Sequence, residues 1–225
     1  MILGTGTYGT VDLTDQGDVI KKIPAKGFSI YLREVFNLVY LNKEPNLHVV
    51  GLKGFSVPEM NIKLERGSED IAAWIKKSPS SAERGKVISQ LLLCVWWLHH
   101  MQITHADLKL GNIIYVRNTD SIRLIDFGFS GLPGWCHHTC TTPAYADPNK
   151  EDGPSGDIYS LGIILTELLT GVPFISRPSA SKIRDALQVL GSDHRKIISR
   201  MISLKRKRPT IDEVCTSFGL RLPPF

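Results

Sequence analysis

His105-Ala106-Asp107-Leu108-Lys109-Leu110-Gly111-Asn112 is followed along the chain by Asp126-Phe127-Gly128, and these two stretches decide the fold and the chemistry that we predict. Apolar, strand-like runs flank both stretches, so each is expected to be a loop anchored on a core. Phosphoryl transfer needs a carboxylate near the attacking hydroxyl and oxygen ligands for Mg²⁺ on a nucleotide. Asp107 suits the first need, and Asn112 and Asp126 suit the second. The alternative, a surface loop with scattered carboxylates, is disfavoured by the presence of both motifs at this spacing.

The two stretches resemble the catalytic loop and the metal-binding loop of eukaryotic-type protein kinases, whose patterns are H-R-D-L-x-x-x-N and D-F-G. Ala106 in place of Arg is the one departure. The resemblance implies an α+β, bilobal fold with a small β-rich N-terminal lobe and a mainly helical C-terminal lobe. It also implies ATP and Mg²⁺ as cofactors, Asp107 and Lys109 as catalytic residues, and Asn112 and Asp126 as metal ligands. The short chain, with a small residue beside His105, is also similar to compact kinases of large DNA viruses.

The composition is that of an ordinary globular protein, because 42% of the 225 residues are hydrophobic and 22% are charged. No apolar run reaches the roughly 18 residues of a membrane span, and the start of the chain lacks a secretory signal pattern. Four cysteines without a disulfide-framework pattern fit a reducing compartment. We therefore expect an intracellular protein, cytoplasmic or nuclear, that does not bind membranes; its oligomeric state is left open.

The positive net charge lies near the C-terminus, where residues 176–225 hold 11 Lys and Arg against 4 Asp and Glu. The run Lys205-Arg206-Lys207-Arg208 is the centre of this excess. Such a run is typical of a nuclear-import signal or of a surface for acidic partners. A solvated loop between helices is the favoured interpretation, and nucleic acid is not an expected partner.

The chain begins with a glycine-rich stretch, residues 4–11, whose pattern G-x-G-x-x-G also occurs in dinucleotide-binding folds. A dinucleotide-binding turn leads into a helix, whereas residues 10–13 and 18–23 here predict a β-hairpin. The loop between strands is the arrangement of protein kinases, in which glycines let the backbone close over phosphates. The nucleotide-binding residues that the resemblance implies are Leu3, Gly4, Gly6, Gly9, Val11, Val19, Lys21, Leu64, Glu65 and Ile114.

Two lysines compete for the role of the phosphate-binding lysine in the strand at 18–23, which resembles the family's V-A-I-K motif. Strand alternation puts Val19 and Lys21 on one face and Lys22 on the other, so Lys21 is predicted to reach the phosphates. Residues 28–41 predict a helix with an apolar stripe formed by Ile30, Val35, Leu38 and Leu41. Glu34 is predicted to lie off that stripe, on a polar edge, and it resembles the ion-pair partner of Lys21.

The remaining pattern predicts strands at Val49–Leu52 and Asn61–Glu65 and then mostly helices. In the resemblance Leu64 is the gatekeeper behind the adenine and residues 65–67 are the hinge. Residues 1–225 are expected to form a single domain with lobes at 1–67 and 68–225. The helical patterns begin at the capping box Ser80-x-x-Glu83, span 156–170, 181–190 and 194–204, and begin again at the capping box Thr210-x-x-Glu213.

The segment Thr141–Asn149 resembles the family pattern G-T-P-x-Y-x-A-P-E, with Asn149 in place of the final Glu. That Glu pairs in the family with an Arg, here Arg208, so we expect either a less stable lobe or another acid. Asp157 resembles the buried acid that supports the catalytic loop.

Residues 136–140, Cys-His-His-Thr-Cys, have zinc-ligand chemistry, but structural zinc sites usually draw on two separated pairs. An exposed loop is therefore the favoured interpretation there. In kinases that are switched by phosphorylation, the Arg beside the catalytic Asp neutralises the new phosphate. Because Ala106 has no charge, a phosphate on Ser130, Thr139 or Thr141 would lack that partner, and activity is predicted not to need it.

Three functions are open to such a chain. A Ser/Thr protein kinase acting on protein substrates is favoured, because Lys109 and Thr142 resemble a pair typical of Ser/Thr-specific kinases. A small-molecule kinase of the aminoglycoside or choline type would generally lack this lysine and the Thr-Pro-x-Tyr segment. A pseudokinase that acts as a binding module would have lost one of the motif residues, all of which are present. The substrate cannot be read from the sequence, although Gly111 argues against a strong preference for Arg upstream of the target.

Overall fold

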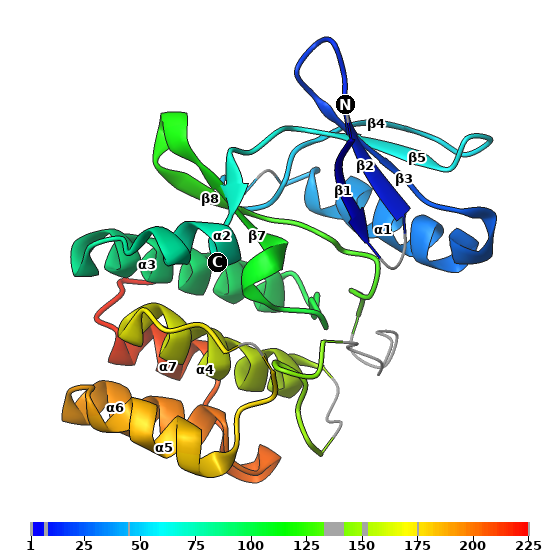
Figure 1. Cartoon of the computed structure of the whole chain (residues 1–225). Helices are drawn as coiled ribbons and strands as arrows, with labels where there is room; N and C mark the ends of the chain where they lie inside the picture. Colours follow the sequence, from blue (N-terminus) through cyan, green and yellow to red (C-terminus); the bar gives the residue numbers. More distant parts are fainter. Residues whose placement is uncertain are drawn as a thin grey trace.

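The computed structural model describes residues 2–6, 9–44, 46–132, 142–149, 153–174 and 176–224. Five strands form an antiparallel sheet in the order β1-β2-β3-β5-β4. They are β1 (Ile2–Gly6), β2 (Gly9–Leu13), β3 (Val19–Lys22), β4 (Leu52–Ser56) and β5 (Asn61–Leu64). The helix α1 (Phe28–Leu41) lies beside this sheet (Figure 1). The hairpin predicted around residues 14–17 is confirmed, with Leu13 opposite Val19.

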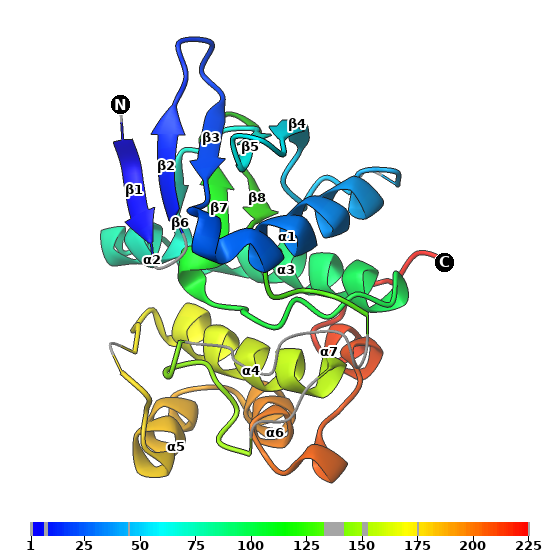
Figure 2. The same ribbon diagram turned by 90° about the vertical axis from the view of Figure 1, so that its right-hand side faces the viewer.

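Below this sheet lies a second part of the molecule that is mostly helical (Figure 2). It contains a small sheet of β6 (Glu69–Asp70), β7 (Ile113–Val116) and β8 (Ser121–Leu124). Its helices are α2 (Ile71–Trp74), α3 (Ser81–His100), α4 (Pro154–Thr170), α5 (Ala180–Gln188), α6 (Ser192–Met201) and α7 (Ile211–Ser217). Short 3-10 turns lie at Ala25–Gly27, Ile75–Lys77, Leu110–Asn112, Arg117–Thr119 and Lys205–Lys207. The predicted α+β class, with a β-rich and a helical part, is confirmed.

The helices begin and end where local side-chain chemistry allows it. The Ser80 hydroxyl accepts a hydrogen bond from the Glu83 amide at 3.2 Å, and the Glu83 carboxylate accepts one from the Ser80 amide at 2.7 Å. This capping box satisfies two amides that would otherwise lack partners at the start of α3. The second predicted capping box, at Thr210, begins α7 in the same way. α4 ends at Thr170 and is followed by Gly171, whose positive φ of 73° favours glycine.

Two predictions about the β-rich part are wrong. The strand expected at Val49–Leu52 instead begins at Leu52, because Val49 and Val50 are buried against β8 and Val50 donates its amide to Leu124 at 3.1 Å. An apolar run alone does not distinguish a strand from a buried crossing segment. Glu34 does not lie on a polar edge of α1. It is fully buried, since it is four residues from both Ile30 and Leu38 and so shares their face of the helix.

The last residue predicted for α4 is the observed one, and the other predicted ends of α4, α5 and α6 differ from the observed ends by one to three residues. Gly191 is the residue that precedes α6. The lobe boundary near residue 67 stays a prediction; residues 65–68 connect β5 to β6. Among the residues that the structure describes, no helix combines the length and apolar character needed to cross a membrane.

Arg208 has an acid partner despite the change to Asn149. Its Nη1 lies 2.7 Å from Oδ2 of Asp147, and both side chains are almost fully buried. Asp147 precedes Asn149 by two residues, and its Oδ1 accepts the Asn149 amide at 3.0 Å. Of the two expectations, the use of another acid is therefore the one that the structure supports.

Candidate active site

A cavity of about 720 Å³ lies between the two parts of the molecule. Its volume is within the range of pockets that hold a small-molecule ligand. The predicted residues that line it are Leu3, Gly4, Gly9, Val11, Val19, Lys21, Glu34, Leu64, Glu65, Asp107, Lys109, Asn112, Ile114 and Asp126. Gly6, also predicted, ends β1 and is paired with Gly9. Residues separated by more than a hundred positions in the chain therefore meet at one cavity.

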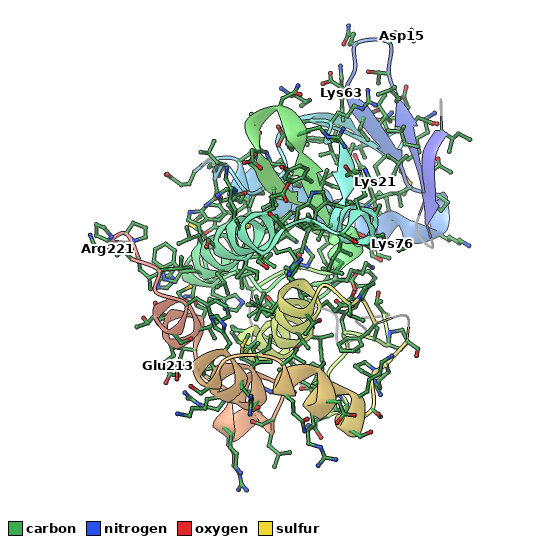
Figure 3. The ribbon with its side chains drawn as sticks, turned by 60° about the vertical axis from the view of Figure 1, so that its left-hand side comes forward. Asp15, Lys21, Lys63, Lys76, Glu213 and Arg221 are labelled. Atoms are coloured by element: carbon green, nitrogen blue, oxygen red, sulfur yellow. The ribbon has the colours of Figure 1, made fainter. Side chains whose placement is uncertain are left out.

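Lys21 stands at the centre of the charged part of this cavity. Its Nζ lies 2.7 Å from Glu34 Oε2 and 2.8 Å from Asp126 Oδ1. In Figure 3 Lys21 lies between the strands and the helices, whereas Asp15 and Lys63 lie at the outer end of the sheet. Lys22 points the other way, is exposed, and pairs with Asp12 at 3.0 Å. The strand register thus gives the two lysines opposite environments.

The ionisation of Lys21 follows from these neighbours. Burial by itself would lower the pKa of its ammonium, but the attraction of Glu34 and Asp126 outweighs that and raises the pKa. Burial also acts against the charged form of Asp126, yet the Lys21 charge and hydrogen bond lower the pKa of this carboxyl. Lys21 therefore carries its positive charge, and Asp126 its negative charge, at neutral pH.

Gly9, at the start of β2, brings the backbone close to β3. A Cβ atom at this position would lie 2.0 Å from the Lys22 carbonyl oxygen, and its φ of 148° disfavours other residues. A side chain here would displace the strand that carries Lys21. The requirement for glycine at this position therefore comes from strand packing and backbone conformation.

Asp107 lies at the inner wall of the cavity and is 1% exposed. Its carboxylate is 2.6 Å from Lys109 Nζ and accepts a hydrogen bond from the Asn112 amide at 3.1 Å. Lys109 Nζ also donates to Thr142 Oγ1 at 3.1 Å. These contacts bring Thr142, from a distant segment, to the catalytic-loop stretch. One fixed carboxylate and one cation thus face the same part of the cavity.

The backbone of this loop is supported from below by Asp157 of α4. The Asp157 carboxylate accepts the amides of His105 at 2.8 Å and Ala106 at 2.9 Å, and it lies 3.0 Å from His99 Nε2. Ala106 has a φ of 65° and Asp126 a φ of 67°. This left-handed conformation costs a residue other than glycine about 1 kcal/mol. The Asp157 bonds to the backbone offset this cost at Ala106.

The oxygen atoms available in the cavity fit a hard divalent cation bound with a nucleotide. The Asn112 amide nitrogen donates to Asp107, which leaves its Oδ1 free of hydrogen bonds to any described part of the chain. The second carboxylate oxygen of Asp126 is free in the same sense. Mg²⁺ is usually bound by one or two such side chains together with phosphates of the substrate. No cluster of three or more His, Cys, Asp or Glu that could hold a metal occurs in the described ranges.

Two sets of predicted residues have different outcomes. The possible zinc ligands at 136–140 and the phosphorylation sites Thr139 and Thr141 lie outside the described residues. Ser130 is fully buried, and its hydroxyl donates to the His105 carbonyl at 2.9 Å. In this conformation the Ser130 hydroxyl is therefore not accessible for phosphorylation, and the prediction that activity needs no phosphate on this segment stays a prediction.

Some residues at the site have no counterpart in the predictions. Arg123 of β8 donates to Glu65 Oε1 at 2.7 Å, and the Gly51 amide donates to the same oxygen at 2.9 Å. Asn37 of α1 is buried and contacts the stretch after Asp126. A polar residue on the apolar face of α1 was the only signal for Asn37. No local pattern pointed to the pairing of Arg123 with Glu65.

Comparison with known proteins agrees with this geometry. A family model described as the protein kinase domain matches residues 1–218. CBL-interacting protein kinase 1 of Oryza sativa subsp. japonica is 31% identical over 192 residues, which are 78% of this chain and 40% of that protein. Serine/threonine-protein kinase kin-29 of Caenorhabditis elegans is 29% identical over 210 residues, 81% of this chain and 24% of that protein.

The Hormonally up-regulated neu tumor-associated kinase of Mus musculus is 36% identical over 114 residues, 46% of this chain and 16% of that protein. The chain therefore spans less than half of the length of each of these curated relatives.

Proposed function

This chain belongs to the protein kinase family, and we propose that it transfers the γ-phosphate of ATP to Ser or Thr hydroxyls of protein substrates. The observation that carries this proposal is the contact of Asp107 with Lys109 and Thr142, beside the pair of Lys21 with Asp126. These contacts support the proposal because a carboxylate that could accept a hydroxyl proton and two lysines that could bind phosphates line one cavity. The family as a whole uses ATP and a divalent metal.

Each residue has a separate task in the proposed reaction. Lys21, held by Glu34, contributes a fixed positive charge to nucleotide phosphates. Asp107 accepts a hydrogen bond from the substrate hydroxyl and orients its oxygen toward the phosphorus. Lys109 stabilises the negative charge that develops on the transferred group. Asn112 and Asp126 would hold Mg²⁺, which when bound with the nucleotide neutralises phosphate charge.

The choice of Ser and Thr rests on Lys109 and Thr142. Lys109 reaches both Asp107 and Thr142, so the segment around Thr142 is held against the catalytic loop. The family resemblance associates this pair with Ser/Thr-specific kinases. The names of two relatives support the proposal, since one is a protein kinase and the other a serine/threonine-protein kinase.

The test compares Asp107→Asn with the wild type. Asn has the same shape but accepts the hydroxyl proton poorly, so we expect turnover of a generic protein substrate to fall by about 10²–10⁴-fold. The dissociation constant for ATP should stay within about threefold, because the carboxylate acts mainly in the transition state. Asp185→Asn, on the exposed face of α5, is the matched control and should behave as the wild type.

Phosphoamino-acid analysis of the product completes the test. Phosphoserine and phosphothreonine are expected. Phosphotyrosine alone, or phosphorylation only of an aminoglycoside or choline, would contradict the substrate class. A wild-type protein that binds ATP but turns over no substrate would instead be a binding module, and the proposed enzymatic function would then be wrong.

A further inference from the structure

Asn37 of α1 makes two buried hydrogen bonds to the stretch that follows Asp126. Its Nδ2 donates to the Phe127 carbonyl at 3.1 Å and to the Ser130 carbonyl at 2.8 Å, and the side chain is 1% exposed. Because both partners are carbonyl oxygens, only the donor side of the amide fits here. One side chain thus satisfies the buried Ser130 carbonyl and adds a second hydrogen bond to the Phe127 carbonyl, which also accepts the Ser130 amide at 3.2 Å.

Glu34 lies one helical turn before Asn37, on the same face of α1. Glu34 contacts Lys21, and Lys21 contacts Asp126. The helix is therefore joined to the Asp126-Phe127-Gly128 turn at two points, by the ion pairs on one side and by the Asn37 amide on the other. The packing between them is close, since a Cβ at Gly128 would lie 2.6 Å from Ile30 Cγ2.

The segment that Asn37 holds is also attached to the catalytic loop. The Ser130 hydroxyl donates to the His105 carbonyl, and Thr104 and Gly131 exchange backbone hydrogen bonds of 2.9 and 3.1 Å. Residues 127–131 therefore lie between α1 and the stretch that carries Asp107. A shift of this segment would move Asp126 and Asp107 relative to each other.

We propose that Asn37 is a positioning residue that holds Lys21, Glu34 and Asp126 in their catalytic arrangement without a phosphate on the activation segment. The proposal rests on the kinase function proposed above. Ala106 offers no cation to a phosphate, so this chain lacks one partner by which phosphorylation orders such a segment. The Asn37 amide supplies a link that is present in the fold itself. Both of its donors are used, and neither depends on a modification.

The expected size of the change in the opening of residues 127–131 follows from the hydrogen bonds that are lost when Asn37 is replaced. The buried Ser130 carbonyl would lose its donor and the Phe127 carbonyl would keep only the Ser130 amide, which favours conformations in which water reaches these groups. We expect the equilibrium between the closed and the opened segment to shift by about 10- to 100-fold. The apparent affinity for a ligand that needs the closed state falls in proportion to the remaining closed fraction.

The experiment compares Asn37→Leu with the matched control Asn42→Leu. Asn42 ends the same helix and ties it to β4, donating to Leu38 at 2.9 Å and accepting from the Leu52 amide at 3.1 Å. It does not contact the segment at 127–131 among its described hydrogen bonds. Asn37→Leu loses a buried amide and Asn42→Leu a half-buried one, so both variants should lose stability. Only Asn37→Leu should release the segment at 127–131.

Hydrogen exchange of the ligand-free protein, well below either melting temperature, provides a measurement that does not depend on activity. In Asn37→Leu the Gly131 and Thr104 amides should exchange about 10- to 100-fold faster than in Asn42→Leu, with equal rates in the core of α3. The dissociation constant of Mg·ATP should rise about tenfold or more in Asn37→Leu only. If this variant does not fold, Asn37→Ser, which keeps one donor, should give a smaller change in the same direction.

Equal exchange at Gly131 in the two variants would overturn the proposal. Phosphatase treatment of the wild type provides a second decisive result, because exchange at Gly131 should not change. If phosphatase treatment accelerated exchange of the Gly131 amide as much as Asn37→Leu does, a phosphate rather than Asn37 would hold the segment. If the wild type had no kinase activity, the proposed function would fail, whereas the exchange data would still decide the positioning role of Asn37.

Discussion

The ion pair between Asp147 and Arg208 gives a quantitative prediction for Asp147→Asn. Both side chains are at most 3% exposed, and the pair is 2.7 Å long. Removing one member of a buried pair leaves the other charge uncompensated and usually costs about 3–5 kcal/mol. Arg208 would keep hydrogen bonds to the Ser155 and Ser203 carbonyls and its position over the Tyr159 ring. We therefore expect the lower end of this range, about 3 kcal/mol of lost free energy of unfolding.

Urea unfolding at pH 7 measures this loss directly. The urea concentration at the midpoint should decrease, while the slope of the free energy of unfolding against urea concentration should not change. The control is Asn149→Ala. Asn149 occupies the position of the family's acid, yet its side chain makes only a 3.4 Å contact with Asp147, so the loss should stay below about 1 kcal/mol. The double variant Asp147→Asn with Asn149→Glu then tests whether an acid at residue 149, where the family has its Glu, can pair with Arg208 in place of Asp147.

A loss below about 1 kcal/mol in Asp147→Asn would refute this reasoning. It would mean that the carbonyl groups around Arg208 are sufficient for its charge. Recovery of most of the lost stability by the added Asn149→Glu would support the interpretation that the acid has moved by two positions.

The other predictions concern the lysines, a buried carboxyl and phosphorylation. In a kinase assay Lys21→Met should abolish turnover, whereas Lys22→Met should leave it nearly unchanged, because Lys22 is exposed and pairs only with Asp12 among the described residues. The opposite result would show that the assignment of Lys21 to the cavity face of its strand is wrong. Burial raises the pKa of Glu167 from 4.5 to about 7, so its contribution to stability is fully present below about pH 4.5 and is lost as the pH rises through about 7. Glu167→Gln should therefore remove about 3 kcal/mol of pH dependence between pH 4 and 8, measured by urea unfolding, and an unchanged pH profile would argue against this. Phosphatase treatment and the double Ala variant of Thr139 and Thr141 should each leave turnover within a few-fold of the untreated enzyme, whereas a tenfold drop in both, about 1.4 kcal/mol, would identify another cation as the phosphate partner.

Much of the fold was predictable because it depends on interactions between residues close in the chain. The capping boxes at Ser80 and Thr210 mark their helices, since each satisfies amides within one turn. The hairpin before Lys21 follows from two alternating strands around a turn of polar residues and glycine. The alternation of that strand also predicted which lysine faces the cavity. The candidate site was predictable to the same extent, because its motifs lie in short loops anchored by apolar strands.

The sequence by itself thus determined the α+β class, most of the elements and the identity of the motif residues, because periodicity and capping are local properties. The tertiary structure alone decided which distant groups meet. Asn37 bonds to carbonyl groups 90 and 93 positions away, and Arg208 finds Asp147 rather than the residue at the family position. It also decided that Glu34 and Ser130 are buried. The physical reason is that a buried polar group must find a partner wherever the fold brings one within about 3 Å, and neither composition nor periodicity encodes that approach.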